Sequence, residues 1–143
     1  MGAFQDSQQL YDTVGELLRG AARDPGIGAS VARTEIVIQF RYVNPDAEIA
    51  LNAKDRPTQP DAYFDVVFGP NNLYPDVVMT MSGDLAHEFW QGRINLFSAL
   101  ARKQILATGA VDKVLRLVPV AEPLFPQYVA LLRYKGLERL ILR

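Results

Sequence analysis

The sequence predicts an α+β fold, in which a five-stranded, mostly antiparallel sheet carries helices over one face. Apolar residues recur at helical spacing near both ends of the chain, whereas the stretch between residues 35 and 81 alternates apolar and polar side chains as strands do. The alternation leaves one strand face polar, so the helices are expected to cover the other face. The length of 143 residues predicts a single domain over residues 1–143.

The first segment is predicted to be a helix that buries one face. Its apolar residues follow helical spacing: Leu10, Tyr11, Val14, Leu17, Leu18 and Ala21. Asp6 or Ser7 can cap its start. Residues 24–28 are expected to end it, because proline lacks a backbone donor and glycine tolerates positive φ.

Four stretches then read as strands: 35–43, 47–53, 63–68 and 76–81. In the first of them, Phe40 belongs to an apolar face, while Gln39 and Arg41 belong to the opposite, polar face. From residue 82 the period becomes helical again. Ser82 and Asn95 are expected to cap two short helices, residues 104–108 to form a last strand, and residues 110–118 and those from Pro123 onward to form helices.

Composition excludes several classes of function. The chain is 49% apolar with a net charge of −1, and it lacks the basic surplus expected of a nucleic-acid-binding protein. It has no cysteine and one histidine, His87, which excludes thiol chemistry and multi-histidine metal sites. We expect no cofactor and no enzymatic activity. The chain shows neither a secretory signal nor an apolar run of about 20 residues, so the cytoplasm is the expected location.

Residues 75–109 resemble the core of the sterol carrier protein type 2 family. The features in common are Asp76, Met81-Ser82, Asp84, Gly92-Arg93, Asn95, Ser98-Ala99 and Thr108-Gly109. Leu96 stands where that family usually has proline, and Arg102-Lys103 where it often has glycine. The resemblance implies a non-catalytic domain that carries an apolar ligand, such as a sterol or fatty acid, in a tunnel between sheet and helices.

Short helices pack loosely on a sheet, and a gap lined by apolar side chains stays dry and can hold an apolar molecule. The residues expected to line such a tunnel are Phe40, Leu51, Phe68, Met79, Met81, Phe89, Trp90, Phe97, Leu100, Leu115, Phe125 and Val129. For each of them, ordinary core packing is the alternative.

Three further interpretations stay open. The chain could be an accessory module that presents a lipidic substrate to a partner enzyme. Asp84 and His87 could share a helix face, but without further ligands or a nucleophile the expected role is a helix-start carboxylate beside a solvated histidine. The basic, leucine-containing C-terminal segment could contact a membrane transiently, the alternative being a solvated helix face.

Overall fold

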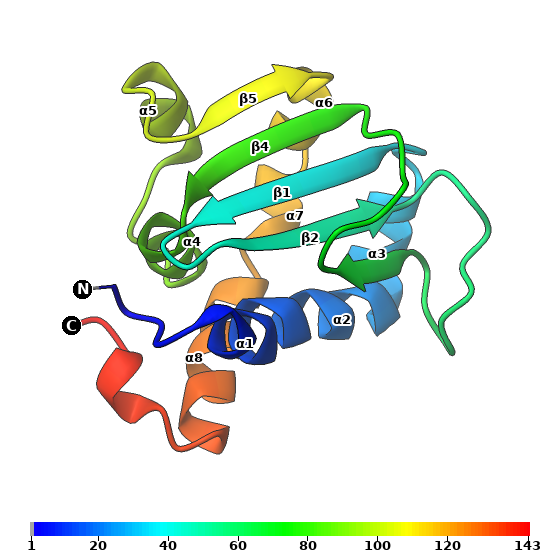
Figure 1. Cartoon of the computed structure of the whole chain (residues 1–143). Helices are drawn as coiled ribbons and strands as arrows, with labels where there is room; N and C mark the ends of the chain where they lie inside the picture. Colours follow the sequence, from blue (N-terminus) through cyan, green and yellow to red (C-terminus); the bar gives the residue numbers. More distant parts are fainter. Residues whose placement is uncertain (1) are drawn as a thin grey trace.

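The computed structural model describes residues 2–143 and contains a five-stranded sheet in the order β3-β2-β1-β4-β5 (Figure 1). The strands are β1 (Val37–Val43), β2 (Ala47–Asn52), β3 (Asp65–Phe68), β4 (Val77–Ser82) and β5 (Leu106–Gly109). All neighbouring strands are antiparallel except β1 and β4, which run parallel. The predicted α+β class and the mostly antiparallel sheet are therefore confirmed.

The N-terminal helical segment is continuous from Ser7 to Arg23. It comprises α1 (Ser7–Leu10), a π-helical stretch (Tyr11–Gly15) and α2 (Glu16–Arg23). Asp6 caps it, since its side chain accepts from the Gln9 amide. The buried side chains of this segment include Leu10, Val14 and Leu17, as helical spacing predicted.

The remaining helices are mostly short. They are α3 (Pro25–Ala32), α4 (Gly83–Trp90), α5 (Leu96–Ala101), α6 (Val111–Leu115), α7 (Val118–Ala121), α8 (Leu124–Tyr134) and a 3-10 turn (Glu138–Leu140). Figure 1 shows α1 to α3 and α6 to α8 on one side of the sheet, with α5 beside β5 at the upper edge.

One local expectation was incomplete and another was wrong. Residues 24–28 end α2 as predicted, but they also begin α3, because the Asp24 carboxylate accepts from the amides of Gly26 and Ile27 and Pro25 suits the first turn. The single helix predicted over 110–118 is two helices, α6 and α7. Pro119 lies in the first turn of α7, where its missing amide donor costs nothing.

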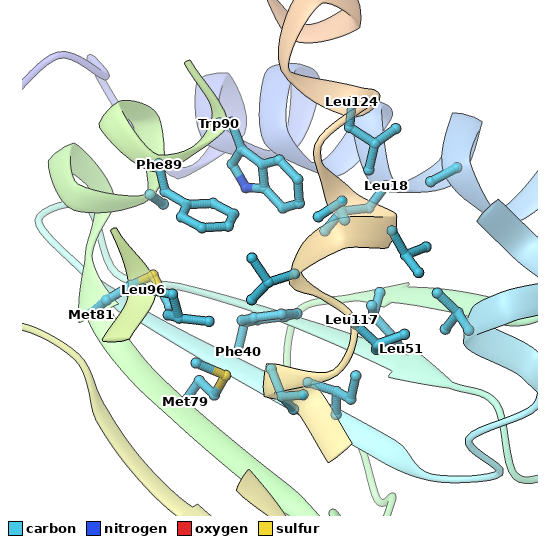
Figure 2. A pocket seen from close by; sticks show the side chains of 18 of the residues that line it. Leu18, Phe40, Leu51, Met79, Met81, Phe89, Trp90, Leu96, Leu117 and Leu124 are labelled. Atoms are coloured by element: carbon cyan, nitrogen blue, oxygen red, sulfur yellow. The ribbon is translucent and has the colours of Figure 1, made fainter. Parts of the chain in front are cut away.

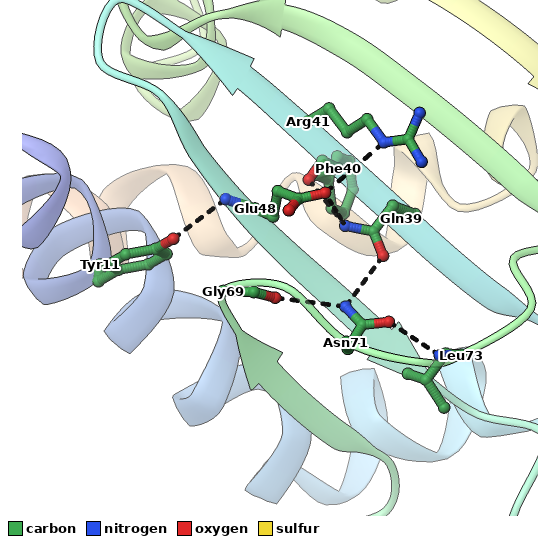
Figure 3. Close-up of polar contacts among 8 residues, drawn as sticks. All are labelled: Tyr11, Gln39, Phe40, Arg41, Glu48, Gly69, Asn71 and Leu73. Atoms are coloured by element: carbon green, nitrogen blue, oxygen red, sulfur yellow. Dashed lines mark hydrogen bonds and ion pairs between the residues drawn. The ribbon is translucent and has the colours of Figure 1, made fainter.

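The outer face of the sheet is polar and partly covered by the connection from β3 to β4 (Figure 3). Asn71 in this connection donates to the Gln39 side chain over 3.2 Å, and Gln39 is only 4% exposed. Arg41 and Glu48 form an ion pair of 3.6 Å on the same face. Because the connection crosses this face, β4 comes to lie beside β1 and parallel to it.

Candidate functional site

An apolar cavity of about 100 Å³ lies between the sheet and the helices (Figure 2). Its floor is formed by side chains on the inner face of β1, β2 and β4: Ile38, Phe40, Tyr42, Leu51, Met79 and Met81. Phe89 and Trp90 of α4 form one wall, which is continued by Leu96 at the start of α5 and Ile105 just before β5. Residues 111–121, which comprise α6 and α7 and are called the roof below, contribute Val114, Leu117, Val118, Val120 and Ala121.

Among residues 2–143, no charged side chain lines the cavity, and the phenol of Tyr42 and the indole of Trp90 are the polar groups among the lining side chains. Burial raises the pKa of the Tyr42 phenol well above its usual range, so this group is neutral. Such a lining offers dispersion contacts and dry space and provides no charge partner for a ligand.

The half-buried lining residues indicate that the cavity is open to solvent between α4 and α7. Phe40 lies on the inner face of β1, the central strand, yet it is only half-buried, whereas its neighbours on the same face are buried. The other half-buried lining residues are Phe89 and those at 117, 118, 120 and 121. The partly exposed part of the lining is thus confined to Phe40 on the floor, to α4 and to residues 117–121.

The roof is the most weakly packed wall. In α6 only Val114 is buried, in α7 no residue is buried, and neither helix has a side-chain cap. Short helices without caps have little intrinsic stability. Opening the cavity further would therefore cost least at the roof.

The structure brings together six of the residues expected to line a tunnel: Phe40, Leu51, Met79, Met81, Phe89 and Trp90. The other six lie elsewhere. Phe68 stacks on Tyr11 at 5.1 Å and lies 3.7 Å beneath the Arg19 guanidinium. Phe125 packs behind the wall, with its ring 5.5 Å from that of Phe89.

Phe97 is 56% exposed, because α5 instead turns the side chains of Leu96 and Ala99 inward. Leu100, Leu115 and Val129 are half-buried and lie outside the cavity lining. The lining residues that the prediction missed include Tyr42 and Ile38, which share the face of Phe40 and were accessible from strand alternation.

His87 was expected to be solvated, and that expectation is wrong, since it is 2% exposed. Its Nε2 lies 2.7 Å from the Leu140 carbonyl oxygen and its Nδ1 lies 2.8 Å from the Tyr128 hydroxyl oxygen. A carbonyl oxygen only accepts, so Nε2 donates and Nδ1 accepts from the hydroxyl. Burial lowers the pKa of His87, and the ring is a neutral structural group that joins α4 to the C-terminal tail.

Asp84 likewise has a structural role, because its carboxylate accepts a hydrogen bond of 2.7 Å from the Ala3 amide. Within residues 2–143, no group of three or more histidine, aspartate or glutamate side chains is placed to hold a metal ion.

The C-terminal segment uses its apolar side chains for the core. Leu132 and Leu140 are buried, and the Leu142 amide donates to Gln91 of the α4 end over 2.7 Å. Its basic side chains at positions 133, 135 and 139 are exposed. Across the described part of the chain, no helix is both long and apolar enough to span a membrane.

No protein-family model and no curated protein sequence matches the chain. Solved structures do. Sterol carrier protein 2 from Yarrowia lipolytica in its apo form matches with a TM-score of 0.58 and 18% identity, over 76% of this chain and 87% of that one. The sterol carrier protein domain 2 of Helicoverpa armigera matches with a TM-score of 0.61 and 15% identity, over 81% and 91%.

A third structure, a UbiJ-SCP2 ubiquinone synthesis protein, matches with a TM-score of 0.54 and 15% identity, over 77% of this chain and 85% of that one. At these identities the comparisons establish the fold. The resemblance read from residues 75–109 is confirmed at that level.

Proposed function

We propose that this chain, which has the fold of the sterol carrier protein 2 domains, binds an apolar ligand in the cavity beneath the sheet and carries it without chemical change. The observation that supports the proposal is the lining itself, which is apolar throughout and free of charged side chains. Each methylene that such a lining removes from water contributes about 0.8 kcal/mol.

The size of the cavity sets a condition on how such a ligand enters. The cavity of about 100 Å³ is smaller than the roughly 150 Å³ of an engineered cavity that holds benzene. A fatty acid or a sterol is larger than benzene, so its entry requires the roof to move away from the sheet. We infer that the roof opens between α4 and α7, where the lining is already half-buried.

Passive carriage fits the residues around the site. His87 and Asp84, the pair considered for chemistry, are held by Leu140, Tyr128 and Ala3. Neither lines the cavity. A carrier needs a ligand to enter and leave intact, and for that a movable apolar wall is sufficient.

The test uses Trp90, the only tryptophan, which lies in the cavity wall. Titration with oleic acid is expected to change Trp90 emission saturably, and native mass spectrometry should detect the complex. Ala121→Phe places a phenyl ring in the cavity, whereas Ala130→Phe makes the same change at an exposed position of α8. A phenyl ring displaces roughly four methylenes of ligand, which corresponds to ~3 kcal/mol and a hundredfold or greater loss of affinity.

Ala130→Phe should bind oleic acid as the parent protein does. Equal affinity in both variants, or emission that does not respond to oleic acid, a sterol or a long-chain isoprenoid, would contradict a ligand site in this cavity.

A second candidate is an accessory module that presents a lipidic substrate to an enzyme. It is supported by the fold shared with a protein named for ubiquinone synthesis. A free carrier should move a fluorescent fatty acid between vesicles unaided. An accessory module should bind the same lipid but leave the transfer rate at the spontaneous value until its partner enzyme is added.

A further inference from the structure

We propose that the edge of the molecule formed by α5, β5 and α6, residues 93–116 and called the basic edge below, docks on an anionic lipid bilayer. This inference rests on the proposed function for the identity of the surface, since a carrier of lipid must meet a membrane. Figure 1 shows the three elements together along the upper edge of the sheet.

Charge is distributed unevenly along the chain. The basic edge carries five basic side chains and the single acidic residue Asp112: Arg93, Arg102, Lys103, Lys113 and Arg116. The whole chain nevertheless has a net charge of −1, so the rest of the molecule is acidic. A local basic surface on an acidic protein favours one orientation against a negative surface.

Arg102 and Lys103, like Lys113, are basic side chains of this edge that form no ion pair or hydrogen bond with the rest of the described chain. Across residues 2–143 neither forms an ion pair, whereas Arg116 pairs with Asp112 at 3.6 Å and Arg93 donates to the carbonyl of Arg143 over 3.1 Å. Both are exposed in the turn between α5 and β5. Their charges are thus available to lipid headgroups.

Two apolar side chains accompany them. Phe97 on α5 and Leu106 on β5 are each 56% exposed. Exposed aromatic and aliphatic side chains among basic ones are the combination by which peripheral proteins enter the headgroup region. An uncharged partner surface would gain nothing from the basic side chains of this edge. A purely ionic partner would gain nothing from the exposed ring of Phe97.

Lys103 occupies a backbone position that disfavours it. Its φ is 60°, the left-handed conformation that glycine adopts without strain at the end of a helix. The amide of Gln104 closes the α5 terminus on the Ala99 carbonyl at 2.9 Å, so the conformation is built into the helix end. Glycine would serve the fold better here, and what lysine adds is an exposed charge.

The inner side of the basic edge is cavity wall. Leu96, Ile105 and Val114 lie within or beside its elements and line the cavity. Docking at this edge therefore places the bilayer against part of the cavity wall, including α6 of the roof that must move for a ligand to enter.

Vesicle cosedimentation tests the proposal, using phosphatidylcholine vesicles with or without 30 mol% phosphatidylserine. The parent protein should bind the anionic vesicles selectively. Arg102→Gln with Lys103→Gln should weaken that binding about thirtyfold, since a basic residue near such a surface contributes ~1 kcal/mol. The matched control is Arg133→Gln with Lys135→Gln, which removes the same charges around the exposed Tyr134 at the other basic segment.

The Lys103→Gly variant separates the effect of losing the charge from the effect of losing stability. It should raise the melting temperature by about 3 °C, because strain is removed, while weakening vesicle binding about fivefold. A more stable protein that binds less well cannot owe the loss to misfolding.

Equal binding to neutral and anionic vesicles would overturn the proposal, as would a loss confined to the Arg133 and Lys135 control pair. No binding to either vesicle would also overturn it and would point to an acidic protein as the partner of this edge. The oleic acid titration of Trp90 is independent of these readings, so selective docking without ligand binding would refute the proposed function alone.

Discussion

Truncating Phe40 distinguishes a cavity floor from a packed core. Phe40 lies on the central strand β1, where a phenylalanine would ordinarily be fully buried, and Phe40→Ala would then cost about 3–5 kcal/mol. In this structure Phe40 is half-buried and faces empty space, so part of its surface already lacks neighbouring atoms. We expect Phe40→Ala to lower the free energy of unfolding by only about 1–2 kcal/mol.

Phe4 provides the matched comparison, because it is buried and does not line the cavity. It precedes α1, is 5% exposed, and its truncation to alanine should lower the free energy of unfolding by about 3–5 kcal/mol. Urea unfolding of the parent and the two variants, followed by far-UV circular dichroism, gives the three free energies. If Phe40→Ala proves as costly as Phe4→Ala, the floor is filled core and the reasoning from its exposure is refuted.

Two further predictions concern the fold around the site. Burial lowers the pKa of His87 below its ordinary value of 6.5. The unfolded chain therefore binds a proton at this imidazole more readily than the folded chain does. The stability that neutral His87 contributes is complete above pH 6.5 and is lost as the pH falls below 6.5. The loss of unfolding free energy between pH 7.5 and 5.5 should therefore be smaller in His87→Gln than in the parent, and an identical loss would show that His87 is not linked to folding. Gly109 has a φ of 92° and an added Cβ would overlap the Asp76 carbonyl oxygen, so Gly109→Ala should cost more than ~2 kcal/mol in urea. Gly20→Ala, on α2 with no atom within 4 Å of the added Cβ, should instead gain ~0.5–1 kcal/mol, and equal effects at the two positions would contradict this account.

Much of the fold was predictable because it depends on short-range chemistry. Asp6, Ser82 and Asn95 each cap the helix that follows, through a side-chain oxygen that accepts from the amide three residues on. Strand alternation placed Phe40 and Met79 on the same inner face, where the β1–β4 register makes them partners. Such signals depend only on residues that are close in sequence, so the features that they predict are retained in the folded structure.

The helical half of the site was less predictable. A helix of six residues such as α5 has too few turns to show which side is buried, so Phe97 was expected inside for its size although Leu96 occupies the cavity side. The parallel pairing of β1 with β4 depends on a connection that crosses the outer face of the sheet, and strand periodicity does not record that path. The cavity itself is the space left by all these elements, so no single segment encodes it.

The attachment of both chain ends to α4 has a mechanical consequence. The Ala3 amide bonds to Asp84, and the tail bonds to His87, Gln91 and Arg93 through backbone groups of residues 140–143. A force that pulls the two ends apart would act first on these few hydrogen bonds, one after another, and only later on the strand ladders. Once these bonds break and the buried side chains of Phe4 and Leu140 are released, the wall that carries Phe89 and Trp90 would lose its support while the sheet is still intact.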